Sequence, residues 1–237
     1  MRNAVVLIKC PACAKPYRLN EDELGPALWC PFCHHSLAAE APAPLPQRPT
    51  YVVFDLETTG LAPRYDAIIQ IAGVRLCGGV IDESDFFATY VNPGCRIPPF
   101  IQSYTGVTED DVRDAPHTAQ ALEAFSRYVG ESGLIAHNGH RFDMAFIRAA
   151  CERYGLATRP VYCYDSLSLS RRLWGRGNGH SLDIVVRRLQ ITAGMYRRHD
   201  ARGDVHLLAE AVSRMWGMLS SDYRMQAMQS QMGVLPA

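Results

Sequence analysis

Four cysteines within the first 33 of 237 residues place the strongest limit on how this chain can fold. They form two C-x-x-C pairs that are separated by 16 residues. Each C-x-x-C turn aims its two sulfurs at one point, and two such turns complete a tetrahedron with each sulfur about 2.3 Å from a zinc ion. We therefore predict a zinc site with four ligands, Cys10, Cys13, Cys30 and Cys33.

The segment around this site, residues 1–37, is too small to bury a core of its own, so a bound metal would supply most of its folding free energy. It resembles a zinc ribbon. A closed set of four thiolates leaves no open coordination position, so the metal is expected to be structural. The alternative is four free buried cysteines. His34 and His35 follow the last cysteine and are expected on the surface.

Zinc ribbons bind either nucleic acid or protein, and the residues of this one fit two interpretations. The cations Lys9, Lys15 and Arg18, together with Tyr17 and Trp29, could contact a nucleic-acid backbone or its bases. The two aromatic residues could equally form the small core of the module. The role of the ribbon therefore stays open at this point.

The rest of the chain divides by composition. Residues 38–49 contain four prolines in twelve positions, which predicts an Ala/Pro-rich, semi-rigid, extended linker. Residues 50–219 form the main domain. Residues 220–237 are rich in Met and Gln without a clear apolar stripe, so we expect a short helix or a frayed tail there.

Bulk composition argues against two classes of protein. Basic and acidic residues number 24 each, and a net charge of zero disfavours a protein that coats nucleic acid by charge alone, although not one that grips it locally. No apolar run approaches the roughly 18–20 residues that cross a bilayer. The apolar run at residues 4–8 is shorter than the about 7–15 residues of a signal-peptide core. We therefore expect a cytoplasmic protein with no membrane partner.

The apolar pattern of the main domain predicts strands first and helices later. Strands are expected at 51–55, 67–76, 80–91 and 134–136, and helices at 118–129, 142–154 and 204–218. Thr108 can cap a further short helix, with Asp111 three residues on. Three strands followed by helices and short strands indicate an α/β or α+β domain with a mixed central sheet.

Two carboxylates, Asp55 and Glu57, end the first strand of this domain. Residues i and i+2 of a strand point to the same face, so both carboxylates aim the same way. Burying two like charges side by side is costly unless a cation neutralises them, and Mg²⁺ prefers oxygen ligands of this kind. A D-x-E pair by itself is weak evidence, because most such pairs lie on a solvated face.

Further residues strengthen the prediction of a metal site. Asp143 is expected in the first turn of the helix that follows the strand at 134–136. His199 precedes the last long helix, and Asp204 lies at the start of that helix, so the loop can fold the histidine over the aspartate.

The motifs DLETTG (55–60), AHNGHRFD (136–143) and HDARGD (199–204) resemble the DnaQ-like exonuclease family, in its subclass with a catalytic histidine. This family includes the proofreading epsilon subunit of bacterial replicative DNA polymerase. The resemblance spans residues 51 to about 215. It implies a ribonuclease H-like α/β fold, with helices on both faces of the sheet. It also implies stepwise 3′→5′ hydrolysis of a polynucleotide to nucleoside 5′-monophosphates.

The resemblance also implies a role for each of five residues. Two cations, Mg²⁺ or Mn²⁺, would lie about 3.5–4 Å apart and clamp the scissile phosphate. Asp55 would bind both, Glu57 and Asp204 the cation on the nucleophile side, and Asp143 the other. His199 would be the general base, because a pKa near 6.5 leaves a large neutral fraction at cellular pH. A solvated loop histidine is the alternative.

Substrate contacts are implied more weakly, mainly at residues that follow the D-x-E pair and would wedge against the terminal nucleotide. The predicted contacts are Thr58, Thr59, Gly60, Leu61, Asn138 and Phe142, with Tyr104 and Thr105 as fainter candidates. For Leu61, Phe142 and Tyr104 the alternative is ordinary core packing. His137 is expected to shape the site or contact substrate.

The charge of the chain is unevenly distributed. Residues 50–143 carry a net charge of −7, whereas residues 171–202 carry eight arginines and a net charge of +6. An arginine-rich wall beside a metal site would track a phosphate backbone. The alternative is a solvated helix face.

We therefore expect a 3′→5′ exonuclease that acts on DNA with a free 3′ end, single-stranded or frayed. One alternative is an exoribonuclease, because only a contact with the 2′-OH separates the two substrates. The other is an adaptor whose zinc ribbon docks on a polymerase or on another part of a replication or repair complex.

Overall fold

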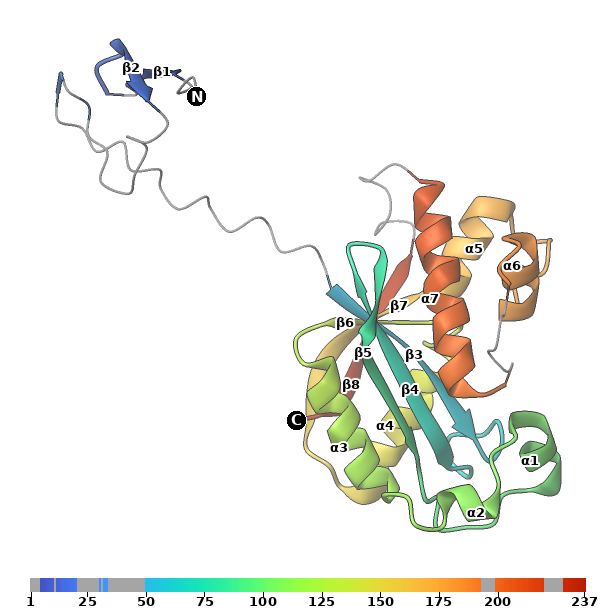
Figure 1. The fold of residues 1–237 in the computed structure, drawn as a ribbon. Helices are drawn as coiled ribbons and strands as arrows, with labels where there is room; N and C mark the ends of the chain where they lie inside the picture. Colours follow the sequence, from blue (N-terminus) through green and yellow to red (C-terminus); the bar gives the residue numbers. More distant parts are fainter. Residues whose placement is uncertain are drawn as a thin grey trace. The chain divides into compact units, whose positions relative to one another are not determined.

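The computed structural model describes residues 5–10, 12–20, 30, 32–33, 50–192, 199–219 and 228–237 (Figure 1). Two compact units are present, residues 1–47 and 48–237. The predicted linker at 38–49 lies outside the described residues. No helix in the described ranges is long and apolar enough to span a membrane.

The first unit contains an antiparallel hairpin of β1 (Val5–Lys9) and β2 (Pro16–Asn20). The first C-x-x-C pair lies in the turn that joins these strands. There the backbone N–H of Ala14 donates to the carbonyl of Cys10, and that of Cys10 donates to the carbonyl of Lys15. The turn therefore fixes the backbone on both sides of the two cysteines.

The second unit is built on a mixed sheet, whose six described strands follow the order β5-β4-β3-β6-β7-β8. Parallel pairs join β3 to β6 and β6 to β7, and the other neighbours are antiparallel. The strands are β3 (Thr50–Thr58), β4 (Ile68–Cys77), β5 (Val80–Tyr90), β6 (Gly133–Ala136), β7 (Thr158–Asp165) and β8 (Gln229–Pro236).

Helices cover both faces of this sheet, so the unit has three layers with the sheet in the middle (Figure 1). Helices α3 and α4 pack on one face, and α5, α6 and α7 on the other. The described helices are α1 (Pro99–Thr105), α2 (Glu109–Val112), α3 (Thr118–Val129), α4 (Asp143–Tyr154), α5 (Ser166–Trp174), α6 (Leu182–Arg188) and α7 (Ala201–Gly217).

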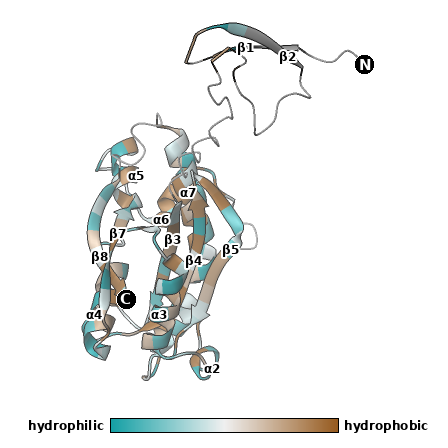
Figure 2. Ribbon diagram, turned by 90° about the vertical axis from the view of Figure 1, so that its left-hand side faces the viewer, coloured by the Kyte–Doolittle hydropathy of each residue, from teal (hydrophilic) through white to brown (hydrophobic). Residues whose placement is uncertain are grey.

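Strand β3 divides the core in two because its side chains alternate between the faces. Val52 and Phe54 pack with α3 and α4, whereas Tyr51 and Val53 pack with α7. Figure 2 shows hydrophobic residues along β3 and β4, both of which are covered on their two faces. A buried central strand of this kind holds its polar end residues rigidly.

The predicted strands and helices of the main domain are present, with small shifts at their ends. The helix expected at 118–129 has these bounds, and Thr108 begins α2 with a reciprocal capping box to Asp111. The apolar pattern did not predict α1, α5 or β7.

The prediction of a tail at 220–237 is wrong for its last part, while residues 220–227 lie outside the described range. Residues 229–236 form the edge strand β8, which pairs antiparallel with β7 along its whole length. The strand inserts Leu235 fully into the core beneath α3 and α4. Its remaining residues are largely exposed, so the sequence carries little alternation to mark it.

Replacing Leu235 with Ala should lower the free energy of unfolding by about 2–5 kcal/mol, because it leaves a cavity in a closed core. The matched control is Gln231→Ala on the same strand, whose exposed side chain should change stability by less than about 0.5 kcal/mol. Chemical denaturation of both variants measures the difference. Equal stabilities would show that β8 does not belong to the core.

Candidate active site

The carboxylates of Asp55 and Glu57 lie where β3 extends beyond its parallel neighbour. Strand β6 pairs with β3 only from Tyr51 to Val53, so the last residues of β3 have no β6 partner. The pairing of β3 with β4 also shifts register immediately after Glu57. Such a bulge bends the strand, so the chain changes direction immediately after Glu57.

A third carboxylate, that of Asp204, reaches this point from the first turn of α7. Oxygens of Asp55, Glu57 and Asp204 all lie within 4.8 Å of one another, close enough for one ion to contact all three. Because Asp204 is buried and the other two are half-buried, their charges repel in a poorly solvated place. The arrangement fits a hard divalent cation bound by oxygen ligands.

Asp143 is brought to the same end of β3 by the start of α4. The backbone N–H of Leu56 donates to its Oδ1 at 3.2 Å, so Asp143 is bonded to the residue that separates Asp55 from Glu57 in the chain. Burial raises the pKa of Asp143 to about 7, and the nearby Asp165 adds to the effect. Gly139 is required in the preceding loop, because a Cβ there would lie 2.4 Å from the Cβ of Ala136.

His199 lies at the same place, just before α7. Its backbone N–H donates to Oδ2 of Asp204 at 3.3 Å, as the predicted fold-back of the loop requires. Its φ of 61° is an unusual, strained conformation for a residue other than glycine. Its ring stacks on Tyr104, with the ring centroids 4.0 Å apart, and Tyr104 in turn stacks on Phe100.

The turn after the D-x-E pair is held by its own hydroxyls. Thr58 Oγ1 donates to the carbonyl of Gly60, and Thr59 Oγ1 accepts from the backbone N–H of Ala67, so both side chains are buried. A Cβ at Gly60 would overlap the carboxylate of Asp66, so a larger residue would displace that side chain. Leu61 is 84% exposed, so the alternative of core packing is wrong for this residue.

The loop before α4 places the other predicted contacts. Asn138 has a left-handed φ of 63°, and its backbone N–H donates to the cap residue Asp165. Phe142 is half-buried and packs on Phe146. His137 is bound to the hydroxyl of Ser166 and the carbonyl of His180, so it shapes the loop.

The fainter candidates on α1 differ in exposure. Tyr104 is half-exposed, whereas Thr105 is buried and its hydroxyl bonds the carbonyl of Ile101. Core packing therefore accounts for Thr105 and does not account for Tyr104.

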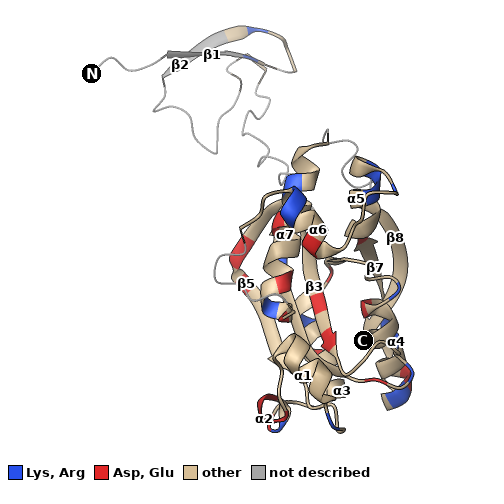
Figure 3. Cartoon of the chain, turned by 90° about the vertical axis from the view of Figure 1, so that its right-hand side faces the viewer, with Lys and Arg blue, Asp and Glu red and all other residues tan. Residues whose placement is uncertain are grey.

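The predicted arginine wall is only partly available to a phosphate backbone. Arg202 is paired with Asp200, and Arg188 donates to the carbonyl of Asn178 and lies over the Trp174 ring. Arg197 and Arg198 lie outside the described residues. The exposed arginines of α5 are in its last turn, and Figure 3 shows them away from the acidic end of β3.

Two residues of the site were not predicted. Gln70 on β4 is buried, and its side chain donates to Asp200 and accepts from the backbone N–H of Ala201, which fixes the start of α7. The signal was a lone polar residue in an apolar strand. Asp165 caps α5 and also holds the loop of Asn138.

The four cysteines of the first unit lie close together. The Sγ atoms of Cys10 and Cys33 are 3.7 Å apart, as are those of Cys13 and Cys30, and all four are free thiols. Ligands about 2.3 Å from a tetrahedral zinc would be separated by about 3.8 Å, so the spacing fits zinc. Although burial opposes it, backbone N–H groups lower the pKa of Cys30 to about 7, which favours the thiolate.

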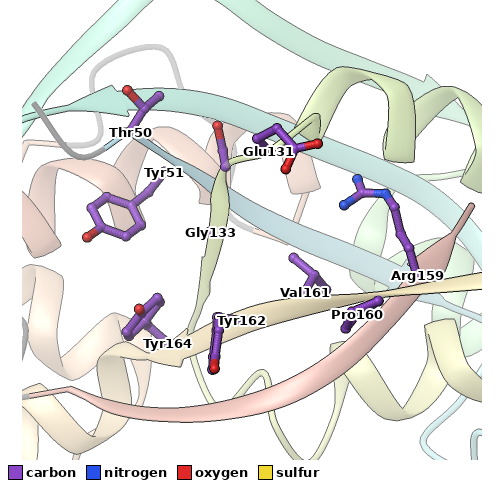
Figure 4. Close-up of a pocket in the computed structure, with 10 residues that line it drawn as sticks. Thr50, Tyr51, Glu131, Gly133, Arg159, Pro160, Val161, Tyr162 and Tyr164 are labelled. Atoms are coloured by element: carbon purple, nitrogen blue, oxygen red, sulfur yellow. The ribbon is translucent and has the colours of Figure 1, made fainter. Parts of the chain in front are cut away.

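A pocket of about 380 Å³ lies at the other end of the sheet (Figure 4). It is lined by residues at the start of β3 and β7, among them Tyr51, Arg159 and Tyr162. It contains none of the predicted site residues, which lie where the strands end. The candidate active site is therefore the carboxylate cluster and not this pocket.

Comparison with known proteins agrees with the fold. The RNase_T exonuclease family model matches residues 52–212, which is more than half of the chain. The chain belongs to this exonuclease family, and the matched region is a DnaQ-like exonuclease domain.

Two curated relatives illustrate the similarity. A DNA polymerase III subunit epsilon-like protein from Rhodobacter capsulatus is 40% identical over 168 residues, which are 70% of this chain and 23% of that protein. A PolC-type DNA polymerase III from Oceanobacillus iheyensis is 38% identical over 170 residues, 70% of this chain and 12% of that protein. The chain thus spans about a tenth to a quarter of the length of these relatives.

Solved structures show the same ribonuclease H-like exonuclease fold. The nuclease domain of 3′hExo, a DEDDh family member bound to rAMP, matches with a TM-score of 0.65 at 19% identity, covering 79% of this chain and 98% of that one. Exonuclease X in complex with 5′ overhanging duplex DNA matches with a TM-score of 0.58 at 23% identity, covering 75% and 98%. The predicted fold class is confirmed.

Replacing Asp143 with Asn should stabilise the protein in buffer without divalent cations, and the gain should grow with pH. The folded pKa is about 7, whereas an unfolded Asp titrates near 3.9. Below about pH 4 both states are protonated and the carboxyl costs nothing. As the pH rises to 7 the unfolded state ionises first, so the wild type loses stability and the full penalty is present above pH 7. Melting temperatures from pH 4 to 8 measure this divergence.

The control for this prediction is Asp114→Asn, which removes an exposed carboxyl outside the site. Its melting temperature should follow the wild type at every pH. A constant difference between Asp143→Asn and wild type across the range would contradict an elevated folded pKa.

Proposed function

We propose that the chain is a 3′→5′ exonuclease that hydrolyses DNA to nucleoside 5′-monophosphates, with His199 as the general base. The observation that carries the proposal is the meeting of Asp55, Glu57 and Asp204 within 4.8 Å, with His199 bonded to Asp204 through its backbone. Three carboxylates and one imidazole at an open strand end suit phosphodiester hydrolysis. A cytoplasmic setting is what we expect for such an enzyme.

The carboxylates would hold the cations. Asp55, Glu57 and Asp204 offer oxygens to one, and Asp143, which lies outside that group and accepts from the backbone N–H of Leu56, would serve a second. When bound, two Mg²⁺ or Mn²⁺ ions would supply positive charge at the scissile phosphate and lower the pKa of a bound water. The raised pKa of Asp143 means that it must lose its proton before it can act as a ligand.

The residues of the chain then carry out the proton transfer and hold the substrate. Neutral His199 accepts a proton from the attacking water, whose oxygen forms a bond to phosphorus. The bond from phosphorus to the 3′-oxygen of the preceding nucleotide breaks, and that oxygen takes up a proton as the new 3′-hydroxyl. Stacking on Tyr104 limits the orientations that the His199 ring can adopt.

The names of the two relatives support DNA as the substrate, since both names refer to DNA polymerase III. The structural neighbours bound to nucleic-acid components include one with duplex DNA and one with rAMP. An RNA-trimming activity is the second candidate. A single strand or frayed end fits the exposed Leu61, which would wedge against the terminal nucleotide.

The first unit is proposed to be a structural zinc ribbon. The spacing of the four sulfurs, which fits the corners of a tetrahedron around zinc, supports this proposal. We propose that it docks the nuclease on nucleic acid or on a replication or repair partner.

His199→Ala should lower kcat on a 3′-labelled DNA oligonucleotide by about 10²–10⁴-fold, the usual contribution of a general base. Asp55→Ala should abolish Mg²⁺-dependent release of mononucleotides. There are two matched controls. His117→Ala removes an exposed histidine at the N-cap of α3, and Glu123→Ala removes an exposed carboxylate within α3. Full activity in either site variant would refute the assigned roles.

Rates on matched DNA and RNA oligonucleotides, with and without Mg²⁺, decide the substrate. The proposal expects faster hydrolysis of DNA. A faster rate on RNA would identify an exoribonuclease, and no hydrolysis of either would favour an adaptor.

One zinc ion per chain should be found by elemental analysis of the purified protein. Cys30→Ser should lower the zinc content, since oxygen replaces one of four thiolate ligands. The control is Cys95→Ser, which alters an exposed thiol of the second unit and should leave the zinc content unchanged. Equal zinc content in the wild type and Cys30→Ser would contradict the four-thiolate site.

A further inference from the structure

A groove of about 730 Å³ lies between the loop after β3 and the outward flank of α4. Pro63 and Arg64 of the loop form one wall, and Arg148 and Arg153 of the helix form the other. The small side chains of α4 at positions 145 and 149 leave room between these walls. No proposed catalytic residue lines this groove.

The charge of the groove is positive and largely unpaired. Three arginines face one carboxylate, that of Glu152, among its lining residues. Arg153 donates to the backbone carbonyls of Pro63, Arg64 and Asp66, which are neutral groups, so it anchors the loop and keeps its charge. The guanidinium groups of Arg64 and Arg148 are exposed, and neither has a salt bridge to a carboxylate in the described part of the chain.

The groove lies on the opposite side of the sheet from the carboxylate cluster. Asp55 and Glu57 alternate with Leu56, which packs with α4, so they face the side of α7. In the chain, the turn that ends in the exposed Leu61 joins β3 to the loop that forms one wall of the groove. The degraded strand, whose 3′ end reaches the carboxylates, would have to pass around this turn to enter the groove. The complementary strand of a duplex could enter the groove directly if it separated from the degraded strand at this turn.

We propose that this groove binds the phosphate backbone of the strand that is not degraded, so that the enzyme engages the end of a DNA duplex. This inference rests on the proposed exonuclease function and names a further class of substrate for it. Arginine is suited to phosphate contacts, which position a duplex without reading its sequence. The exposed ring of Tyr65, 81% accessible, lies in the same loop and is available to a base or sugar at the fork.

The dimensions of the groove agree with this occupant. From Ala145 to Arg153 the helix rises about 12 Å, at 1.5 Å per residue. Successive phosphates of one strand of B-DNA rise by about 3.4 Å, so about three of them would lie along this length. Arg64 and Arg148 could therefore contact different phosphates, one from each wall.

Binding of a labelled DNA duplex with a recessed 3′ end, and of its single degraded strand alone, tests the proposal in full-length protein. Divalent cations are omitted, so that nothing is hydrolysed. The variant Arg64→Gln/Arg148→Gln should bind the duplex about tenfold more weakly in about 0.1 M salt, with little change for the single strand. The slope of log affinity against log salt should fall by about one for each lost contact, for the duplex only.

The control is Arg127→Gln, which removes one exposed arginine in the last turn of α3, near the end of the sheet remote from the site, and is compared with each single variant, Arg64→Gln and Arg148→Gln. It should not alter duplex binding. Equal weakening for duplex and single strand would overturn the proposal, because the groove would then hold the degraded strand. Unchanged duplex affinity would overturn it as well. Melting temperatures confirm folding, and release of mononucleotides from single-stranded DNA tests the proposed function separately.

Discussion

Repulsion among three carboxylates is the constraint on which the second unit depends. Two unit charges within 4.8 Å repel by about 3 kcal/mol or more at an effective dielectric constant near 20. The fold opposes this by packing α7 on β3 and β4. Each buried apolar side chain of that helix contributes about 1.5–3 kcal/mol, and the interface includes Val205, Leu208, Val212 and Met215. The core can therefore hold the carboxylates together, ready for cations that relieve the repulsion.

The rest of the site follows from the short length of β6. Because β6 leaves β3 after three pairs, the end of β3 is open, and the first turn of α4 brings Asp143 to it. Gln70 fixes the start of α7, because its side chain donates to the cap residue Asp200 and accepts from the backbone N–H of Ala201. The end of β3 thus receives one carboxylate from a helix of each layer. The basic groove lies on the outward flank of α4, away from the α7 side that Asp55 and Glu57 face.

Much of this could be read from the residues. Alternation and β-branched runs mark β3, β4 and β5, and the capping box of Thr108 and Asp111 marks α2, because each signal is local. Strand β8 could not be predicted, since the residues of its first half are exposed and it is a strand only because β7, over 60 residues earlier, supplies its hydrogen bonds. The hydroxyls of Thr58 and Thr59 hold the turn, a role that the sequence did not predict because it depends on the positions of Gly60 and Ala67 in three dimensions.

The amino-acid sequence was enough to predict a chemistry for each unit. The spacing of four cysteines predicts a metal site, and three motifs point to the carboxylates and the histidine, because ligand type and local spacing are visible in the chain. Which charges meet depends on the three-dimensional packing. The zero net charge conceals an acidic strand end, arginines that are paired, as Arg202 is with Asp200, and others, such as Arg148, that have no salt bridge within the described residues. Electrostatic interaction depends on distance and burial, and these are fixed when segments far apart in sequence pack on one sheet.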